Sequence, residues 1–155
     1  MNECLRLADQ LHRAFFGGAW HGPSVKEALA GVKAETAAMK ILPGAHTIWE
    51  LTLHIHAWIV EAGATVRGKK YETLKDDKDW PPVIDSSSAA WDQTWTALEQ
   101  AEQSLEDAVG RLPDEKLGEG DRSFYALLHG IVQHNAYHAG QIVLLKNTAT
   151  RADGI

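Results

Sequence analysis

The sequence has little of several features that would point to other kinds of protein. It contains a single cysteine, Cys4, so no disulfide can form within the chain, and this favours a reducing, cytoplasmic setting. No apolar run approaches the roughly 20 residues of a membrane-spanning helix. The first ten residues lack the apolar segment of a signal peptide. We therefore expect a cytoplasmic protein that does not associate with membranes.

Basic residues are also in deficit, with 15 Lys and Arg against 21 Asp and Glu, which gives a net charge of −6. Bare nucleic acid requires a basic patch, and none is visible, so we expect no nucleic-acid partner. Phosphate loops, CxxC pairs and G-x-S-x-G motifs are absent as well. The length of 155 residues suits one domain, which we expect to cover residues 1–155.

Apolar residues recur at helical spacing along most of the chain, and no segment alternates as a strand does. Glycine and proline mark the breaks between the helical segments. Thr47 and Glu50 fit a capping box at the start of one helix, and Ser24 suits the N-cap of a short one. The four long helices that we expect cover residues 3–16, 47–67, 86–110 and 123–147.

The connection over residues 68–86 is long and polar. Neighbouring antiparallel helices are normally joined by short loops, so this length suits a crossover between two helices that run in the same direction. The sequence therefore predicts an all-α fold, a four-helix bundle with a long crossover between the second and third main helices.

Histidines interrupt the apolar stripes of two expected helices. His134 and His138 lie four residues apart in the middle of the last stripe, and His54 lies in the middle of the stripe of residues 47–67. A buried polar group without a partner costs about 1–3 kcal/mol, so such intrusions need a reason. Three imidazoles that meet in a bundle core suit a divalent transition metal with open positions for water or substrate.

The remaining histidines do not share this pattern. His56 lies about 200° round the helix from His54 and should face away. His129 is out of phase with His134 and stays a minor candidate. We expect surface positions for these two and for the other three, which are His12, His21 and His46.

Several other polar or aromatic residues lie near the histidine faces. Glu50 and Glu61 could orient a ligand histidine, although the capping box is the simpler role for Glu50. Gln141 continues the histidine face by one turn and Trp58 follows His54 by one turn, so both are candidates for binding a cofactor or substrate.

Two further sets of polar residues have ordinary interpretations. Glu102 interrupts the apolar stripe of residues 86–110, and we interpret it as a solvated carboxylate at the edge of the bundle. Asn135 and Tyr137 flank the histidine pair and should project off its axis.

Two segments taken together resemble the DinB-like (YfiT-like) superfamily of metal-binding four-helix bundles. They are "TIWELTLHIHAWI" (47–59) and "LLHGIVQHNAYHAGQIVLLK" (127–146), supported by "LPGAHTIWE" and "RSFYALLHGIVQH". The motif is a histidine before xxxW on one helix and HxxxHxGQ on the last. The resemblance spans essentially the whole chain.

The resemblance implies an up-down-down-up bundle, a homodimer, and a zinc, nickel or iron ion held by His54, His134 and His138. Characterised relatives include S-transferases that use bacillithiol or mycothiol, and a thiol-dependent isomerase. In that scheme the metal lowers the pKa of a low-molecular-weight thiol, and the thiolate attacks a small-molecule electrophile.

Two other functions fit the same residues. The protein could be a stress-associated dimeric binding module with a structural or vestigial metal site. It could also be a metal-dependent hydrolase, which would need Glu50, Glu61 or Glu102 as a general base.

Overall fold

The computed structural model describes residues 2–118, 120 and 123–152, and these residues contain helices and no strand, as an all-α fold requires. Among them, no helix combines the length and apolar character that a membrane crossing needs. Short 3₁₀ turns lie at Asp76–Lys78 and Asp114–Lys116. The α-helices are α1 (Glu3–Phe15), α2 (Val25–Leu29), α3 (Ala34–Ala38), α4 (Ile48–Val66), α5 (Ser88–Gly110) and α6 (Phe124–Ala152).

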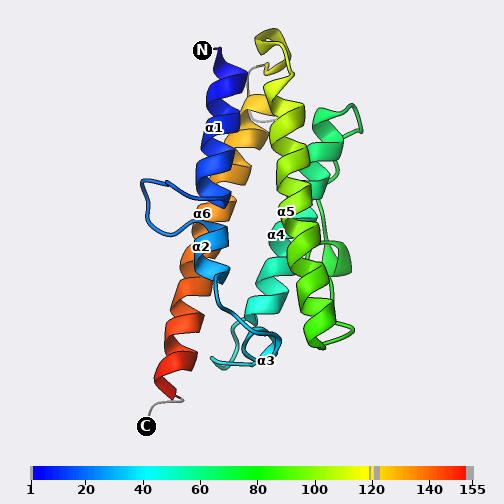
Figure 1. The fold of residues 1–155 in the computed structure, drawn as a ribbon. Helices are drawn as coiled ribbons and strands as arrows, with labels where there is room; N and C mark the ends of the chain where they lie inside the picture. Colours follow the sequence, from blue (N-terminus) through cyan, green and yellow to red (C-terminus); the bar gives the residue numbers. More distant parts are fainter. Residues whose placement is uncertain (1, 119, 121–122, 153–155) are drawn as a thin grey trace.

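The four long helices pack around one core (Figure 1). α4 packs against α5 and α6, and α1 packs against the same two helices from the other side. In Figure 1, α1 and α6 run downward from the end where the N-terminus lies, whereas α4 and α5 run upward. The short helix α2 covers α6, and α3 covers the start of α4.

Side-chain contacts show the same directions. Near the start of α4, Trp49 donates a hydrogen bond from Nε1 to Thr94 near the start of α5. At the end of α4, Arg67 donates to Ser104 in the second half of α5. The two helices are therefore parallel. The polar connection after α4 must return along the whole bundle before α5 begins, which accounts for its length.

Capping boxes set the starts of two helices. The Thr47 side chain accepts a hydrogen bond from the Glu50 N–H while Glu50 accepts from the Thr47 N–H, as the sequence predicts. Ser24 and Glu27 form the same reciprocal pair at the start of α2. Each box satisfies backbone N–H groups that have no partner inside the helix.

Two features of the helices differ from the sequence-based prediction. α3 was not expected, and it forms because Ala34 and Ala37 bury their side chains in the core. α6 continues to Ala152, five residues beyond the predicted end at Asn147. Ala149 is buried there, and one turn earlier Lys146 donates to the carbonyl groups of Ala28 and Ala30. Tertiary packing thus extends a segment of modest helix propensity.

Glu102 contradicts the expectation of a solvated carboxylate. It is fully buried between the turns of Leu98 and Leu105, and neither of its oxygens has a hydrogen-bond partner in the described structure. Burial raises the pKa of this carboxyl well above its usual range, and the nearby Glu106 adds to the effect. Asn135 of α6 is also fully buried and lies beside Glu102, where its amide opposes part of this rise in pKa. Its place in the core therefore favours the protonated, neutral form of Glu102.

Glu102→Gln should make the protein more stable, and increasingly so as pH rises. Below the usual carboxyl pKa of 4.5 both folded and unfolded chains hold the proton. Above it the unfolded chain loses a proton that the folded chain keeps. The free energy of unfolding then falls by up to about 1.4 kcal/mol per pH unit, until the pH reaches the raised pKa. The Glu102→Gln variant has no proton to lose at this position, so its free energy of unfolding should not show this fall with pH.

Denaturant unfolding at about pH 5 and about pH 7 measures the difference between variant and wild type. Asp92→Asn removes an exposed carboxylate from the same helix and serves as the control. A difference in stability that stays constant across this pH range would contradict the burial of a neutral Glu102.

Candidate metal centre

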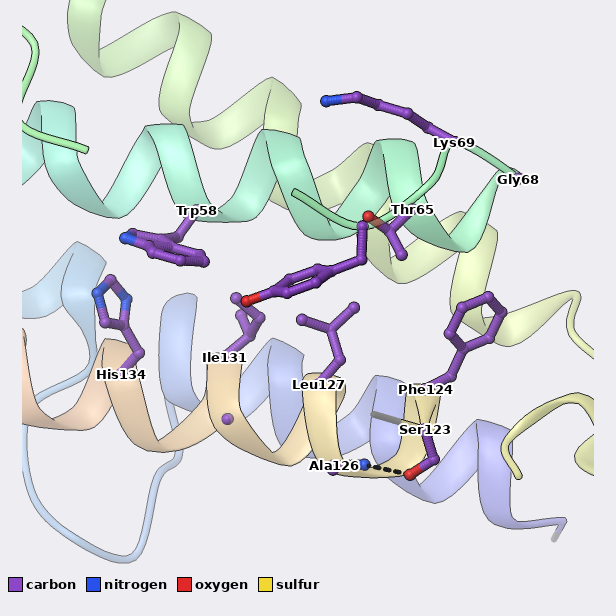
Figure 2. Close-up of a pocket in the computed structure, with 12 residues that line it drawn as sticks. Trp58, Thr65, Gly68, Lys69, Ser123, Phe124, Ala126, Leu127, Ile131 and His134 are labelled. Carbon is purple, nitrogen blue, oxygen red and sulfur yellow. Dashed lines mark hydrogen bonds between the residues drawn. The ribbon is translucent and has the colours of Figure 1, made fainter. Parts of the chain in front are cut away.

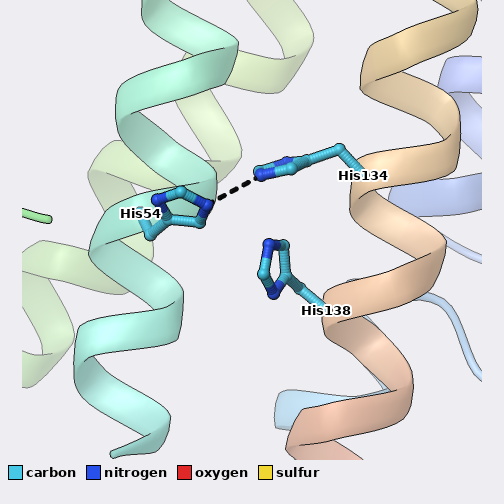
Figure 3. Close-up of side chains that lie close together, drawn as sticks. All are labelled: His54, His134 and His138. Carbon is cyan, nitrogen blue, oxygen red and sulfur yellow. Dashed lines mark hydrogen bonds between the residues drawn. The ribbon is translucent and has the colours of Figure 1, made fainter. Parts of the chain in front are cut away.

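Three imidazoles meet between the middle of α4 and the middle of α6 (Figure 3). His134 and His138 lie one turn apart on α6 and face His54 of α4, as predicted. His54 Nε2 lies 2.9 Å from His134 Nε2. The centroid of the His138 ring lies 4.8 Å from the centroid of the His54 ring and 4.4 Å from that of the His134 ring. The structure thus brings all three residues to one point.

The imidazoles are held in their neutral form. His54 and His138 are each only 6% exposed. Burial lowers the pKa of all three rings, and for His134, where the two neighbouring imidazoles add to the effect, the pKa falls to about 3. Neutral imidazole carries the lone pair that a metal ion needs, so the site offers three ligand nitrogens at neutral pH.

Hydrogen bonds orient two of the rings. His54 donates from Nδ1 to the backbone carbonyl of Asp79 at 2.7 Å, with the Asp79 carboxylate 3.2 Å away. His138 donates from Nδ1 to Gln141 Oε1 at 2.6 Å, and Gln141 in turn donates to the hydroxyl of Tyr137. Both bonds leave Nε2 free to face the centre, which is the arrangement of metal-binding histidines. His134 Nδ1 is buried without a partner in the described structure.

The geometry fits a transition metal ion. Two neutral imidazole nitrogens as close as those of His54 and His134 must share either a proton or a cation. One nitrogen from each of the three rings lies within 4.8 Å of the others. Nitrogens about 2.1 Å from a tetrahedral zinc would lie roughly 3.4 Å apart, so small ring movements suffice. No fourth His, Cys, Asp or Glu joins this cluster within the described ranges, so an ion held by these three residues would keep a coordination position for water or substrate.

The connection between α4 and α5 covers one side of the centre, which the sequence analysis did not foresee. Trp80 stacks on the His54 ring at 3.9 Å between centroids, with only 6° between the planes. His46 stacks on Trp80 at 3.6 Å. Trp58 donates from Nε1 to the Asp79 carboxylate at 2.7 Å. The sequence feature that could have indicated this contact is a tryptophan followed by two prolines, Trp80–Pro82, inside the polar connection.

His46 lies at the surface, as expected, and has a further contact that the sequence did not predict. Its side chain is 48% exposed, so it does reach the surface, but it also belongs to the aromatic stack that ends on His54. Its position just before the capping box of α4 places it beside the returning connection. Helical spacing in the sequence could not predict the contact with Trp80, because that residue lies more than thirty positions further along the chain.

The glutamates that could have supported the ligands lie elsewhere. Glu50 serves its capping box and contacts His46. Glu61 is buried and accepts hydrogen bonds from Lys69 and from the backbone of Glu72. Neither contacts the three imidazoles, and the orienting role belongs to Asp79 and Gln141 instead.

The other histidines lie outside the cluster. His56 is on another face of α4, where it is half-buried rather than at the surface, and burial lowers its pKa. His129 packs against the ring of Tyr125, and His12 contacts Glu106 at 3.2 Å. His21 is exposed. The helical phase argument separates these residues correctly from the three that converge.

A cavity of about 550 Å³ opens beside the centre, between α4 and the first half of α6 (Figure 2). His134 and Trp58 form its inner end, so Trp58 is part of the cavity wall. Gln141 does not line this cavity and instead orients His138. Tyr137 is 65% exposed and projects away from the core, whereas Asn135 projects into it.

The fold and site together define a class: an all-α protein whose packed helices bring three neutral imidazoles to one point. Comparison with known families is more specific. Residues 9–142 match the model of the DinB superfamily, which covers most of the chain, and the protein therefore belongs to this superfamily. Searches of the curated proteins and of the solved structures found no match.

Gln141→Ala should weaken metal binding about 10–100-fold, because His138 loses the acceptor that fixes its ring and tautomer. Competition with a chromophoric zinc chelator measures the affinity. Gln133→Ala removes an exposed glutamine of the same helix and should have no effect. An unchanged affinity in the Gln141 variant would show that this hydrogen bond does not support the site.

Proposed function

We propose that this protein is a metal-dependent enzyme of the thiol S-transferase type, in which His54, His134 and His138 hold a divalent zinc, nickel or iron ion. The observation that carries the proposal is the set of three neutral, convergent imidazoles with an open position beside a cavity. Membership of the DinB superfamily supports it. The directions of the four long helices also support the up-down-down-up bundle implied by the resemblance.

A metal ion at this site would lower the pKa of a coordinated low-molecular-weight thiol, so that the thiolate predominates at neutral pH. Neighbouring residues fix the orientation of the ligand histidines for this chemistry. Asp79 and Gln141 keep two ring tautomers fixed, and the stack of Trp80 on His54 covers that ring. The cavity wall formed by Trp58 brings a small-molecule electrophile next to the centre.

The number of ligands favours a catalytic rather than a structural metal. Structural zinc sites are closed by four protein ligands, whereas catalytic sites use three and keep a position open. The part of the chain that the structure describes supplies three. This argues against a binding module with a purely structural ion.

The positions of the acids argue against hydrolysis. A hydrolase would need a general base beside the metal-bound water. Glu50, Glu61 and Glu102 are all engaged or buried elsewhere. The Asp79 carboxylate lies on the Nδ1 side of His54, away from the convergent nitrogens, and accepts a hydrogen bond from Trp58.

His138→Ala should abolish metal binding, because two imidazoles hold a divalent ion far more weakly than three. Elemental analysis of untagged protein should find about one metal per chain in the wild type. His56→Ala, which removes a histidine of α4 outside the cluster, should keep full metal content. Full metal content in a triple alanine variant of His54, His134 and His138 would refute the site.

Turnover of an electrophile by the metal-loaded protein should require an added low-molecular-weight thiol, since no cysteine lies in the site. Assays with and without thiol, in wild type and in His138→Ala, test this requirement. Turnover that is independent of thiol would favour hydrolysis. Unfolding of the chain on chelation, rather than a modest fall in Tm, would favour a structural ion.

We also propose that the chain forms a homodimer in the cytoplasm, as the family resemblance implies. The protein carries several large apolar side chains on its surface, among them Trp20, Ile84 and Leu144, that a second copy could cover. Molecular mass in solution tests the proposed assembly.

A further inference from the structure

The cavity beside the centre extends from the imidazoles toward the far end of the bundle. Trp58 and His134 lie at one end in Figure 2, and Phe124, Ser123 and Lys69 lie at the other. The rings of Trp58 and His134 are 6.2 Å apart between centroids. A molecule that fills this cavity therefore has one end at the candidate metal centre. Its volume, about 550 Å³, is that of a typical small-molecule site.

The walls of the cavity are mainly apolar and aromatic. Leu127 and Ile131 form the α6 side, and Trp58, Phe124 and Tyr71 bring three aromatic rings. Such walls favour a flat, apolar ligand, because aromatic rings gain both burial and favourable stacking against one another.

The polar groups of the walls are largely occupied already. Trp58 donates its indole N–H to Asp79, and Thr65 donates its hydroxyl to Glu61. Ser123 bonds to the backbone of Gly120 and Ala126. Besides His134 Nδ1, which has no hydrogen-bond partner in the described structure, a polar ligand would find few free groups here to replace its lost hydration, which costs free energy.

Among the described residues that line the cavity, Lys69 is the single charged side chain, and nearby carboxylates neutralise it. Lys69 Nζ lies 2.6 Å from a carboxylate oxygen of Glu61 and 3.7 Å from one of Glu72. The Glu61 side chain is only 5% exposed. An anionic ligand that captured Lys69 would leave a buried carboxylate without its cation, which is strongly unfavourable. A cationic ligand would lose its hydration among mainly apolar walls, and the nearby carboxylates of Glu61 and Glu72 are already paired with Lys69.

We propose that this cavity binds the electrophile and selects an uncharged, largely apolar molecule that carries an aromatic ring, with its reactive carbon at the His134 end. The assignment of this ligand as the electrophile rests on the proposed function, whereas the selectivity of the cavity does not. In the reaction the sulfur of the thiolate forms a bond to this carbon. The leaving group departs with the electron pair of its bond, and the thiol proton has already passed to solvent.

Three naphthalene derivatives that share the same ring system and carry a neutral, an anionic or a cationic substituent test the selectivity. They are naphthalene-2-methanol, naphthalene-2-sulfonate and naphthalen-2-ylmethylammonium, and calorimetry with the metal-loaded protein measures their binding. The sulfonate is a weak metal ligand, so its binding reports on the cavity. The neutral alcohol should bind at least about tenfold more tightly than either ion. Equal binding of the alcohol and the sulfonate would overturn the proposal.

Glu61→Gln tests the role of the buried ion pair. It leaves Lys69 without its close partner at nearly constant shape, so the affinity for the sulfonate should rise about tenfold while that for the alcohol stays within about twofold. Glu72→Gln changes the more distant, half-exposed partner and is the matched control. No gain in sulfonate affinity in the Glu61 variant would overturn the charge argument.

Leu127→Trp tests whether the ligand binds in this cavity. The larger side chain fills the cavity and should weaken binding of the alcohol at least about tenfold with metal content unchanged. Leu144→Trp places the same residue at an exposed position of α6. Undiminished binding in a folded Leu127 variant would place the ligand elsewhere.

The two proposals fail in different ways. If the alcohol binds selectively but no thiol-dependent turnover occurs, the cavity assignment stands and the transferase function fails. If turnover occurs but binding shows no preference for uncharged ligands, the function stands and the selectivity proposal is wrong.

Discussion

The antiparallel contact between the middle of α4 and the middle of α6 is the interaction on which the site depends. Each helix by itself carries polar groups on an apolar stripe, which is unfavourable. Packed together, they place His54 opposite His134 and His138, and each imidazole finds the others within a few ångströms. The cost of burying three rings is thereby concentrated at one point, where a single cation would offset it.

The connection between α4 and α5 is part of this site as well as a link. Because the two helices are parallel, the chain must return along the bundle, and its path passes the histidine cluster. There Asp79 accepts the Nδ1 hydrogen of His54 and the indole hydrogen of Trp58, and Trp80 covers the His54 ring. The topology that requires a long connection therefore also supplies the groups that orient a ligand.

Buried polar groups in this protein fall into two kinds. His54 and His138 have acceptors for their Nδ1 hydrogens, and Glu61 has donors in Lys69 and Glu72. Glu102 and Asn135 are equally buried, yet their side chains have no hydrogen bonds in the described structure. The first kind has hydrogen-bond partners that fix its orientation, whereas the burial of Glu102 favours the protonated form of its carboxyl group.

Helical periodicity and capping chemistry were enough to determine from sequence the four long helices, the start of α4 and the three histidines that converge. These features depend on spacing along one helix, which the chain carries locally. Tertiary structure alone decided that Glu102 is buried, that Gln141 orients His138, and that Asp79 and Trp80 belong to the site. Each depends on which distant segment lies opposite a given face, and local spacing does not contain that information.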